Sequence, residues 1–292
     1  MRAQLLLLAA TLLTACSAPA ATLAAATGTP SIPSSSSTPT IRPSPTLTPP
    51  PTEPPCRSQP GTVRTDEIED PALGRTLPYR IYLPPCYTER PLPSYPTLYL
   101  LHGLASTDSQ WDDLGIDETA TRLIQSGEIP PLLIVMPWER RGLDYLTDLP
   151  DVLVPTIQRL YRAAPERSAR AIGGLSRGAG WALRIGLQRP DLFTAVGLHS
   201  PAVLTPDLYY LPDWLEAIPS GIEPSLWIDI GDHDPLLAPT EELRAILDQA
   251  DYPYEWTLDP GRHEPAYWID HLETYLRWYA RPWETASPAA SP

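Results

Sequence analysis

One five-residue motif restricts the fold of this chain more than any other feature. Residues 174–178 read Gly-Leu-Ser-Arg-Gly, the pattern G-x-S-x-G centred on Ser176. A short, half-apolar stretch at 169–173 precedes the motif, and apolar residues at helical spacing follow it at 179–187. A very sharp strand-to-helix turn leaves no room for side chains at the two glycine positions, and it lifts the serine hydroxyl clear of the sheet. The sequence therefore predicts a nucleophile elbow at Ser176.

Apolar runs alternate with helical patterns along the rest of the chain. Unbroken apolar runs predict buried strands at 97–101, 132–136, 195–198, 225–230 and 255–258. Helical spacing predicts helices at 117–125, 152–161, 240–247 and 267–279, and two earlier strands are expected at 62–68 and 77–83, joined by a turn at 71–74. Strands without polar alternation are typical of a parallel sheet covered on both faces. The expected fold class is therefore α/β.

The start of the chain has the composition of a leader and a spacer. Met1 and Arg2 precede an apolar run at 5–13, which is too short to span a bilayer, and the run ends in Leu-Thr-Ala-Cys. These features predict a signal peptide over residues 1–16. Leu-Thr-Ala-Cys also resembles a bacterial lipobox, which implies a lipid on Cys16 and stable anchoring to a membrane. The alternative is an ordinary secretory signal with an incidental cysteine.

Two further segments lie outside the expected domain. Residues 17–55 consist of Ser, Thr, Pro and Ala with almost no charge, so they cannot bury enough apolar surface to fold and are expected to form a disordered stalk. Residues 282–292 have the same composition and are expected to be disordered. A single domain over residues 56–281 remains. The arrangement predicts an exported lipoprotein on the outer face of the cytoplasmic membrane or at the cell surface.

Cysteine usage and charge exclude some classes of function. Cys56 and Cys86 form an even pair in a chain expected to be exported, so they are predicted to form a disulfide that would stabilise the domain by roughly 3 kcal/mol. The net charge of −14 argues against nucleic acid as a partner, because nucleic-acid binding needs basic surfaces.

A nucleophilic serine needs a base, and the base needs an acid that orients it. In a parallel sheet these groups come from loops at the carboxyl ends of strands. The strand at 225–230 leads into a loop that holds Asp234, the favoured acid, whereas Asp229 inside the strand and Asp232 in the first turn are alternatives. A histidine after this loop would complete the chain order Ser, Asp, His, which α/β enzymes use.

The predicted base is His263, in the loop between the last strand and the last helix, where it could reach back over Ser176. His199 also lies at a strand end and is the alternative base. His102 precedes the serine and is expected to shape the loop after the strand at 97–101. His233 is expected to fix the loop that holds Asp234, and His271 is expected to be a surface or packing residue of the last helix. The histidine and carboxylate spacings match no closed zinc site, so no metal and no cofactor are expected.

The oxyanion hole is expected to use two backbone N–H groups, those of Arg177 after the serine and Leu104 after the strand at 97–101. The substrate pocket is expected to be lined by residues at strand ends and in the insertion before residue 225, namely His102, Trp138, His199 and Trp214. Tyr209 and Tyr210 lie in the same insertion. Aromatic side chains there suit a sugar-linked or phenolic ester, and ordinary packing of an aromatic-rich domain is the alternative.

Together these motifs resemble a known family. They are Leu-Leu-His-Gly-Leu at 100–104, Trp111, Gly-Gly-Leu-Ser-Arg-Gly at 173–178, Gly231 with Asp234, and Gly261 with His263 and Trp268. They resemble the esterase-D-like branch of the α/β-hydrolases, which includes feruloyl and acetyl xylan esterases, S-formylglutathione hydrolases, siderophore esterases and mycolyltransferases. The resemblance covers about residues 62–280. It implies Ser176 as nucleophile, Asp234 as acid, His263 as base, and Leu104 and Arg177 as oxyanion donors.

The expected function is that of a serine carboxylic-ester hydrolase acting on a small-molecule or polysaccharide-linked ester. The lipobox, the stalk and the cysteine pair depart from the family pattern and argue against its cytosolic, glutathione-linked members. Two alternatives remain: an acyltransferase that passes the acyl group to an alcohol, and a non-catalytic surface-binding protein on a hydrolase scaffold.

Overall fold

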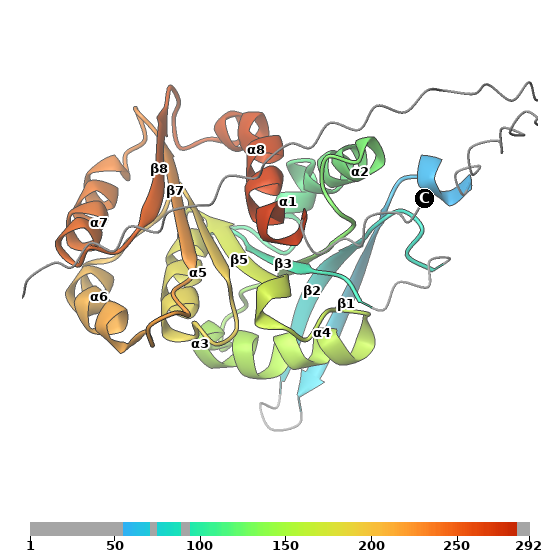
Figure 1. Ribbon diagram of the computed structural model, residues 1–292, viewed down its shortest axis with the longest axis horizontal. Coiled ribbons are helices and arrows are strands. Elements are labelled where there is room, and N and C mark those ends of the chain that lie inside the picture. Colours follow the sequence, from blue (N-terminus) through green and yellow to red (C-terminus); the bar gives the residue numbers. More distant parts are fainter. Residues whose placement is uncertain (1–54, 71–74, 89–93, 285–292) are drawn as a thin grey trace, which may run out of the picture. The chain divides into compact units, whose positions relative to one another are not determined.

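The computed structural model describes residues 55–70, 75–88 and 94–284, which contain one eight-stranded sheet (Figure 1). Its strands are β1 (Thr62–Asp70), β2 (Arg75–Leu83), β3 (Thr97–Leu101), β4 (Leu133–Pro137), β5 (Arg170–Leu175), β6 (Ala195–His199), β7 (Ser225–Gly231) and β8 (Tyr254–Asp259). Their spatial order is β1-β2-β4-β3-β5-β6-β7-β8. β1 and β2 pair antiparallel, as do β2 and β4, and all other neighbours are parallel.

The central strands are buried along their whole length. Every residue of β3, β4, β5 and β6 is buried, which explains why these strands have no polar alternation in the sequence. The sheet is mostly parallel and has helices on both faces, so the α/β prediction is confirmed. All the predicted strands are present, with bounds that differ by a few residues at most.

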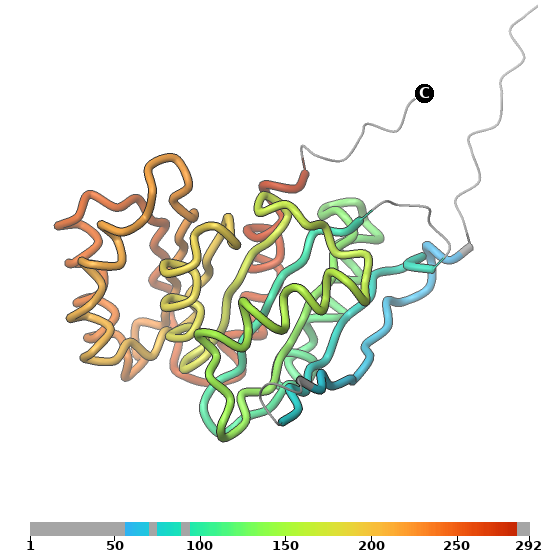
Figure 2. The backbone as a smooth tube through the Cα atoms, turned by 90° about the horizontal axis from the view of Figure 1, so that it is seen from below, coloured from blue at the N-terminus to red at the C-terminus, as the bar shows by residue number. Residues whose placement is uncertain are grey.

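The helices form two layers. Those that follow β3 and β8 cover one face: α1 (Gln110–Asp113), α2 (Ile116–Ser126) and α8 (Pro265–Glu284). The other face is covered by α3 (Tyr145–Asp148), a π-helical turn (Leu149–Leu153), α4 (Val154–Leu160), α5 (Arg177–Gln188), α6 (Thr205–Ala217) and α7 (Leu237–Gln249). Short 3-10 turns are found at Pro55–Ser58 and Arg167–Ala169. Figure 2 shows α6 and α7 at one end of the sheet and β1 at the other.

Helix α6 was not predicted from the sequence, because it contains two prolines. Pro206 lies in the first turn, where no intrahelical N–H is needed, and Pro212 lies inside the helix. The helix is held by an ion pair to α5, in which Arg184 Nε lies 2.6 Å from Asp207 Oδ1. The other Asp207 oxygen accepts the Leu204 N–H at 2.9 Å. Tertiary contacts therefore stabilise a helix that the sequence pattern does not indicate.

The last helix extends past the expected end of the domain. The prediction ended the domain at Arg281, but α8 continues to Glu284. Trp283 is buried, and its indole N–H donates to the Ser168 carbonyl at 2.9 Å. The three additional residues belong to the domain because this side chain packs into it.

The edge of the sheet formed by the amino ends of the parallel strands carries the disulfide. Cys56 and Cys86 are bonded, with their Cα atoms 5.1 Å apart. β2 runs antiparallel to β4, with Tyr82 opposite Ile134, so the end of β2 lies beside the start of β4. Cys86 follows β2 and is therefore at this amino edge.

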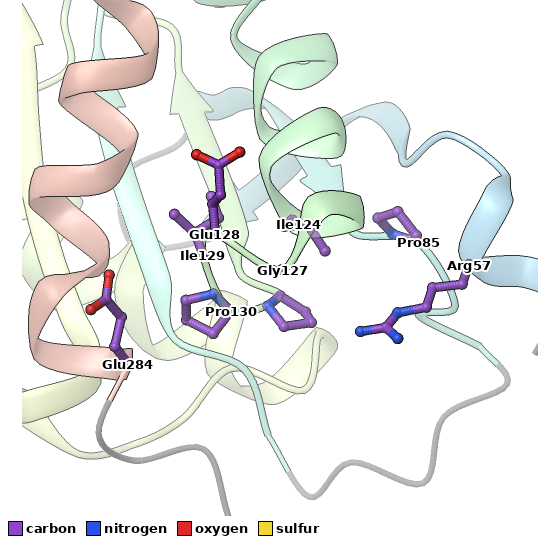
Figure 3. A pocket seen from close by; sticks show the side chains of 9 residues that line it. Arg57, Pro85, Ile124, Gly127, Glu128, Ile129, Pro130 and Glu284 are labelled. Carbon is purple, nitrogen blue, oxygen red and sulfur yellow. The ribbon is translucent and has the colours of Figure 1, made fainter. Parts of the chain in front are cut away.

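A cavity of roughly 420 Å³ opens at the same amino edge, between the end of α2, the residues before β4 and the end of α8 (Figure 3). Arg57, Ile129 and Glu284 are among its lining residues, and Ser176 is not. The cavity therefore lies away from the G-x-S-x-G motif.

The chain divides into two units, residues 1–51 and 52–292, and all described residues belong to the second. The predicted signal peptide, the lipid site at Cys16, nearly all of the stalk and the tail from residue 285 lie outside the described residues. Within the described part of the chain, no helix has both the length and the apolar character that crossing a membrane requires.

Candidate active site

Ser176 lies between the end of β5 and the start of α5, in a strained backbone conformation. Its φ is +54° and its ψ is −120°, in a region that residues other than glycine rarely adopt. A Cβ added at Gly174 would lie 2.5 Å from the Gly178 carbonyl carbon, and one added at Gly178 would lie 2.2 Å from the Leu101 oxygen. Both glycines are therefore required by close backbone packing, as the sequence motif indicated. Strain of this kind persists where the surrounding structure fixes it, and it is concentrated at functional sites.

The Ser176 hydroxyl, His263 and Asp234 form a continuous row of hydrogen bonds. His263 Nε2 lies 3.0 Å from Ser176 Oγ, and His263 Nδ1 lies 2.8 Å from Asp234 Oδ2. The His263 side chain is 23% exposed, whereas that of Asp234 is fully buried. The imidazole can therefore be reached from solvent while its carboxylate partner cannot.

Neither alternative acid contacts His263. Asp229 is bonded to His199, and Asp232 accepts from His233 and from the Gly261 N–H. The two loops that follow β7 and β8 thus bring one carboxylate, Asp234, to the predicted base.

The environment of Asp234 keeps its carboxylate ionised. Burial raises its pKa, but hydrogen bonds from His263 and from the Leu236 N–H, at 2.8 Å, more than offset burial and hold the pKa below its usual range. An ionised carboxylate in this position favours the His263 tautomer that carries its proton on Nδ1, which leaves Nε2 free to accept a proton from Ser176.

The loop after β3 lies directly beside the serine. A Cβ added at Gly103 would lie 3.5 Å from the Ser176 Cβ. Gln110 Oε1 accepts the Gly103 N–H at 2.7 Å and holds the loop in place. In the described part of the chain, the N–H groups of Leu104 and Arg177 have no hydrogen-bond acceptor. Both are thus available to bind a ligand oxygen.

His102 organises this loop. The sequence predicted that it lines the substrate pocket, but the side chain is buried. It is only 5% exposed, and its Nε2 accepts the Glu139 N–H at 2.8 Å. Because Nε2 accepts, the proton of the neutral ring is on Nδ1, which donates to the Gly103 carbonyl at 2.8 Å. Burial lowers the pKa of His102, which keeps the ring neutral. Both ring nitrogens are therefore used to fix backbone groups.

The prediction that His199 lines the substrate pocket is wrong, and so is its alternative assignment as the base. His199 is completely buried, with Nδ1 2.5 Å from Asp229 Oδ1 and Nε2 3.0 Å from the Tyr279 hydroxyl. Its ring stacks on Tyr275 with centroids 3.7 Å apart. The side chain points from the end of β6 into the core beneath α8, where it cannot reach Ser176.

Comparison with known proteins agrees with this geometry. A sequence profile of the Esterase family, described as "Putative esterase", matches residues 71–279. The chain belongs to this esterase family. A solved ferulic acid esterase is 27% identical, with a TM-score of 0.69 over 76% of this chain and 99% of its own. An S-formylglutathione hydrolase from Staphylococcus aureus is 20% identical, with a TM-score of 0.64 over 75% of this chain and 96% of its own, which shows the fold alone.

A curated relative matches a shorter part of the esterase. An endo-1,4-beta-xylanase/feruloyl esterase from Xylanibacter ruminicola is 29% identical over an alignment of length 126, and the match covers 39% of this chain and 17% of the relative. The chain thus matches only a small part of that larger protein. The recognition made from the motifs, an α/β-hydrolase of the esterase-D-like branch, is confirmed by the family match and the fold.

One charged residue beside the site, Glu139, was not predicted from the sequence. Glu139 follows β4 and forms a two-point ion pair with Arg177, whose Nε lies 2.7 Å from Glu139 Oε2. Hydrogen bonding to Glu139 raises the pKa of the Arg177 guanidinium. The pair ties the loop after β4 to the first turn of α5. A single acid after a strand end was the available signal, and it was too weak to use without the fold.

The aromatic residues predicted for the pocket have no recorded contact with Ser176, so their role stays a prediction. Trp138 is half-buried beside the site loops, with the Arg140 guanidinium 5.1 Å from its ring centre. Trp214 is half-buried on α6 against the core. Tyr209 and Tyr210 are 76% and 50% exposed on the same helix. Among described residues, no group of three or more His, Cys, Asp or Glu has an arrangement that would hold a metal ion.

Proposed function

We propose that this esterase hydrolyses carboxylic esters through an acyl-enzyme on Ser176. The observation that supports the proposal most directly is the row of hydrogen bonds from Ser176 Oγ to His263, at 3.0 Å, and from His263 to Asp234, at 2.8 Å. A serine next to a base that is oriented by a buried acid has the arrangement of a nucleophile activated by general-base catalysis.

The first half of the reaction forms the acyl-enzyme. Ser176 Oγ attacks the ester carbonyl carbon while His263 Nε2 takes the hydroxyl proton. The carbonyl oxygen becomes an oxyanion that the N–H groups of Leu104 and Arg177 stabilise, and two such donors would each contribute roughly 3 kcal/mol in the transition state. The tetrahedral intermediate then collapses, and the imidazolium of His263 protonates the leaving alcohol.

The second half releases the acid and restores the serine. Water gives a proton to His263 Nε2 and attacks the acyl carbon, and the same N–H groups stabilise the second oxyanion. Collapse of this intermediate returns the proton from His263 to Ser176 Oγ. The buried carboxylate of Asp234 stabilises the imidazolium in both halves and stays ionised throughout.

The oxyanion donor on Leu104 is oriented by His102. The Gly103 carbonyl and the Leu104 N–H belong to one planar trans peptide group, so they point in opposite directions. His102 Nδ1 donates to that carbonyl at 2.8 Å, which fixes the direction of the N–H as well. A preorganised donor stabilises the oxyanion without rearranging during the reaction.

The substrate that we propose is a sugar-linked or phenolic ester. Two similarities support this class: the 27% identity to a ferulic acid esterase and the 29% identity of part of the chain to a xylanase/feruloyl esterase. We also propose that the esterase is exported and held to a membrane by lipid on Cys16. The bonded Cys56 and Cys86 support export, because disulfides persist in oxidising compartments. Cys16→Ser should move the protein from the membrane fraction to the soluble fraction; unchanged fractionation would remove the anchor from the proposal.

The proposed chemistry is tested by comparing the full-length protein with Ser176→Ala. The wild type should hydrolyse p-nitrophenyl acetate and a feruloyl sugar ester, and Ser176→Ala should lower kcat by roughly 10³-fold or more. Full activity in Ser176→Ala would refute the mechanism. Product analysis with added alcohols separates hydrolysis from acyl transfer, since a transferase would give mainly the new ester.

A further inference from the structure

A buried serine next to the triad has an unusual backbone conformation. Ser200 directly follows β6, is fully buried, and has a φ of +48°. Its N–H donates to the Asp229 carbonyl of the neighbouring strand at 2.7 Å. Residues other than glycine rarely adopt positive φ, and they do so where tertiary contacts fix the conformation. The strained backbone places the Ser200 side chain toward the loops that carry the triad.

The Ser200 hydroxyl is bonded to a tryptophan that contacts the base. Trp268, in the first turns of α8, donates its indole N–H to Ser200 Oγ at 3.3 Å. Trp268 is only 5% exposed, and its ring meets the His263 ring edge-on, with centroids 5.2 Å apart and planes at 87°. The hydrogen bond fixes the indole, and the indole restricts the rotation of the imidazole.

The same hydroxyl also acts on the acid. Burial raises the pKa of Asp234, and His263, the Leu236 N–H and the Ser200 side chain act in the opposite direction. The Ser200 hydroxyl thus contributes to the environment of the acid, and it is bonded to the indole that contacts the base.

We infer that Ser200 and Trp268 are positioning residues that hold His263 and Asp234 in line with Ser176. The inference rests on the proposed function. Ser200 accepts the indole N–H of Trp268, and the indole keeps the His263 ring in the plane in which Nδ1 faces Asp234 and Nε2 faces Ser176. Small displacements of a catalytic group reduce rates strongly, so loss of either side chain should affect chemistry more than substrate binding.

The chain offers a matched control for this pair. Trp227 donates its indole N–H to Thr257 Oγ1 at 3.1 Å, and this tryptophan is also buried. The bond joins β7 to β8, and Trp227 packs against His199 and Trp278 instead of the triad. Thr257→Val removes an indole-to-hydroxyl bond of the same kind without touching the site.

The test measures nucleophile reactivity separately from substrate turnover. The variants are Ser200→Ala, Trp268→Phe, the double variant and Thr257→Val. Each is assayed for its rate of inactivation by a fluorophosphonate probe, for kcat and KM with p-nitrophenyl acetate, and for Tm. Ser200→Gly is included because glycine adopts positive φ without strain, so it removes the hydroxyl even where Ser200→Ala does not fold.

Ser200→Ala and Trp268→Phe are each expected to lower kcat and the inactivation rate by about 10-fold, with KM within about two-fold of wild type. The double variant should lose little more than either single variant, because the two residues act through one bond. Thr257→Val should match wild type in all three kinetic readouts.

Two results would overturn the inference. The first is wild-type kinetics in folded Ser200→Ala or Ser200→Gly, and the second is an equal loss in Thr257→Val. Failure of the proposed function gives a different result, because the wild type itself would then neither react with the probe at Ser176 nor hydrolyse the ester.

Discussion

At the carboxyl edge of the sheet, the loops after β3, β5 and β6 hold three of the five described non-glycine residues with positive φ, namely Ala105, Ser176 and Ser200. The amino edge holds the disulfide between Cys56 and Cys86. It also holds the end of α8, where the Trp283 indole donates to the Ser168 carbonyl. The first edge also has N–H donors that have no acceptor among the described residues. The second has cross-links that join distant parts of the chain, and its positive-φ residue Cys86 belongs to one of them.

The two edges differ in what their local structure contributes: reactivity at the carboxyl edge and stability at the amino edge. Backbone strain and N–H groups without an acceptor lower stability, so they are retained where they create a reactive geometry. A disulfide and a buried indole with a satisfied N–H stabilise the fold and contribute no chemistry. Changes at the carboxyl edge should therefore affect mainly activity, and changes at the amino edge mainly stability.

The largest expected effect is that of His263→Gln. It should lower kcat on the order of 10⁴-fold, because Ser176 loses its base. The free energy of unfolding should change by about 1 kcal/mol or less, since glutamine can still donate to Asp234. Ester hydrolysis and urea unfolding of the same preparation measure both quantities. Activity near that of wild type would remove His263 from the mechanism.

His199→Leu tests whether a position at the carboxyl edge is sufficient for a role in catalysis. His199 lies at that edge but is fully buried against Asp229. Leucine cannot donate to Asp229, and removing one partner of a buried pair costs about 3–5 kcal/mol, so unfolding should occur at much lower urea concentration. The folded fraction should keep kcat within a few-fold. A stable His199→Leu variant without activity would contradict this assignment and make His199 a catalytic candidate again.

The two histidines also show what the sequence could and could not predict. The sequence places both at strand ends, and a strand end indicates proximity to the site but does not say which face the side chain takes. Ser176 was predictable because its two glycines are dictated by local sterics. Asp234 could be favoured over Asp229 and Asp232 only by its depth in the loop. Ser200 gave no signal, since its conformation depends on a neighbouring strand and on α8.

Removing the disulfide tests the amino edge. The double variant Cys56→Ser/Cys86→Ser should lower the free energy of unfolding by about 3 kcal/mol, because a loop spanning a sequence separation of 30 is no longer closed in the unfolded chain. At a temperature where the variant stays folded, kcat and KM should equal those of wild type. If the two edges are independent, the variant will be less stable but fully active. A loss of kcat in the folded variant would show that the two edges are coupled.

His102→Phe should have a smaller effect on activity than loss of the base. The ring is kept but the bonds to Gly103 and Glu139 are lost, so the Leu104 N–H is no longer oriented. Loss of one oxyanion donor costs about 10²-fold or more, and a misaligned donor should cost about 10-fold to 10²-fold in kcat. The control is Arg140→Gln, which changes an exposed side chain next to Glu139 in the loop after β4. Equal kinetics in the two variants would show that His102 does not orient the donor.

The smallest expected effect is on how the free energy of unfolding depends on pH through Asp234. Because the pKa of Asp234 is lower in the folded protein than its usual value near 3.9, its contribution to stability is complete above that value. It is lost as the pH falls through the folded pKa, since the unfolded chain then binds the proton more readily. Asp234→Asn lacks this carboxylate, so its free energy of unfolding should fall less steeply than that of wild type below pH 4. The two slopes should differ by at most about 1.4 kcal/mol per pH unit.

Urea unfolding between pH 2 and 5 measures this slope, beside Asp213→Asn as an exposed control on α6. The control should follow the wild-type curve. If Asp234→Asn also ran parallel to wild type, the carboxylate would not be held by His263, Leu236 and Ser200 in solution. The division between a reactive edge and a stabilising edge would then have to be drawn without Asp234.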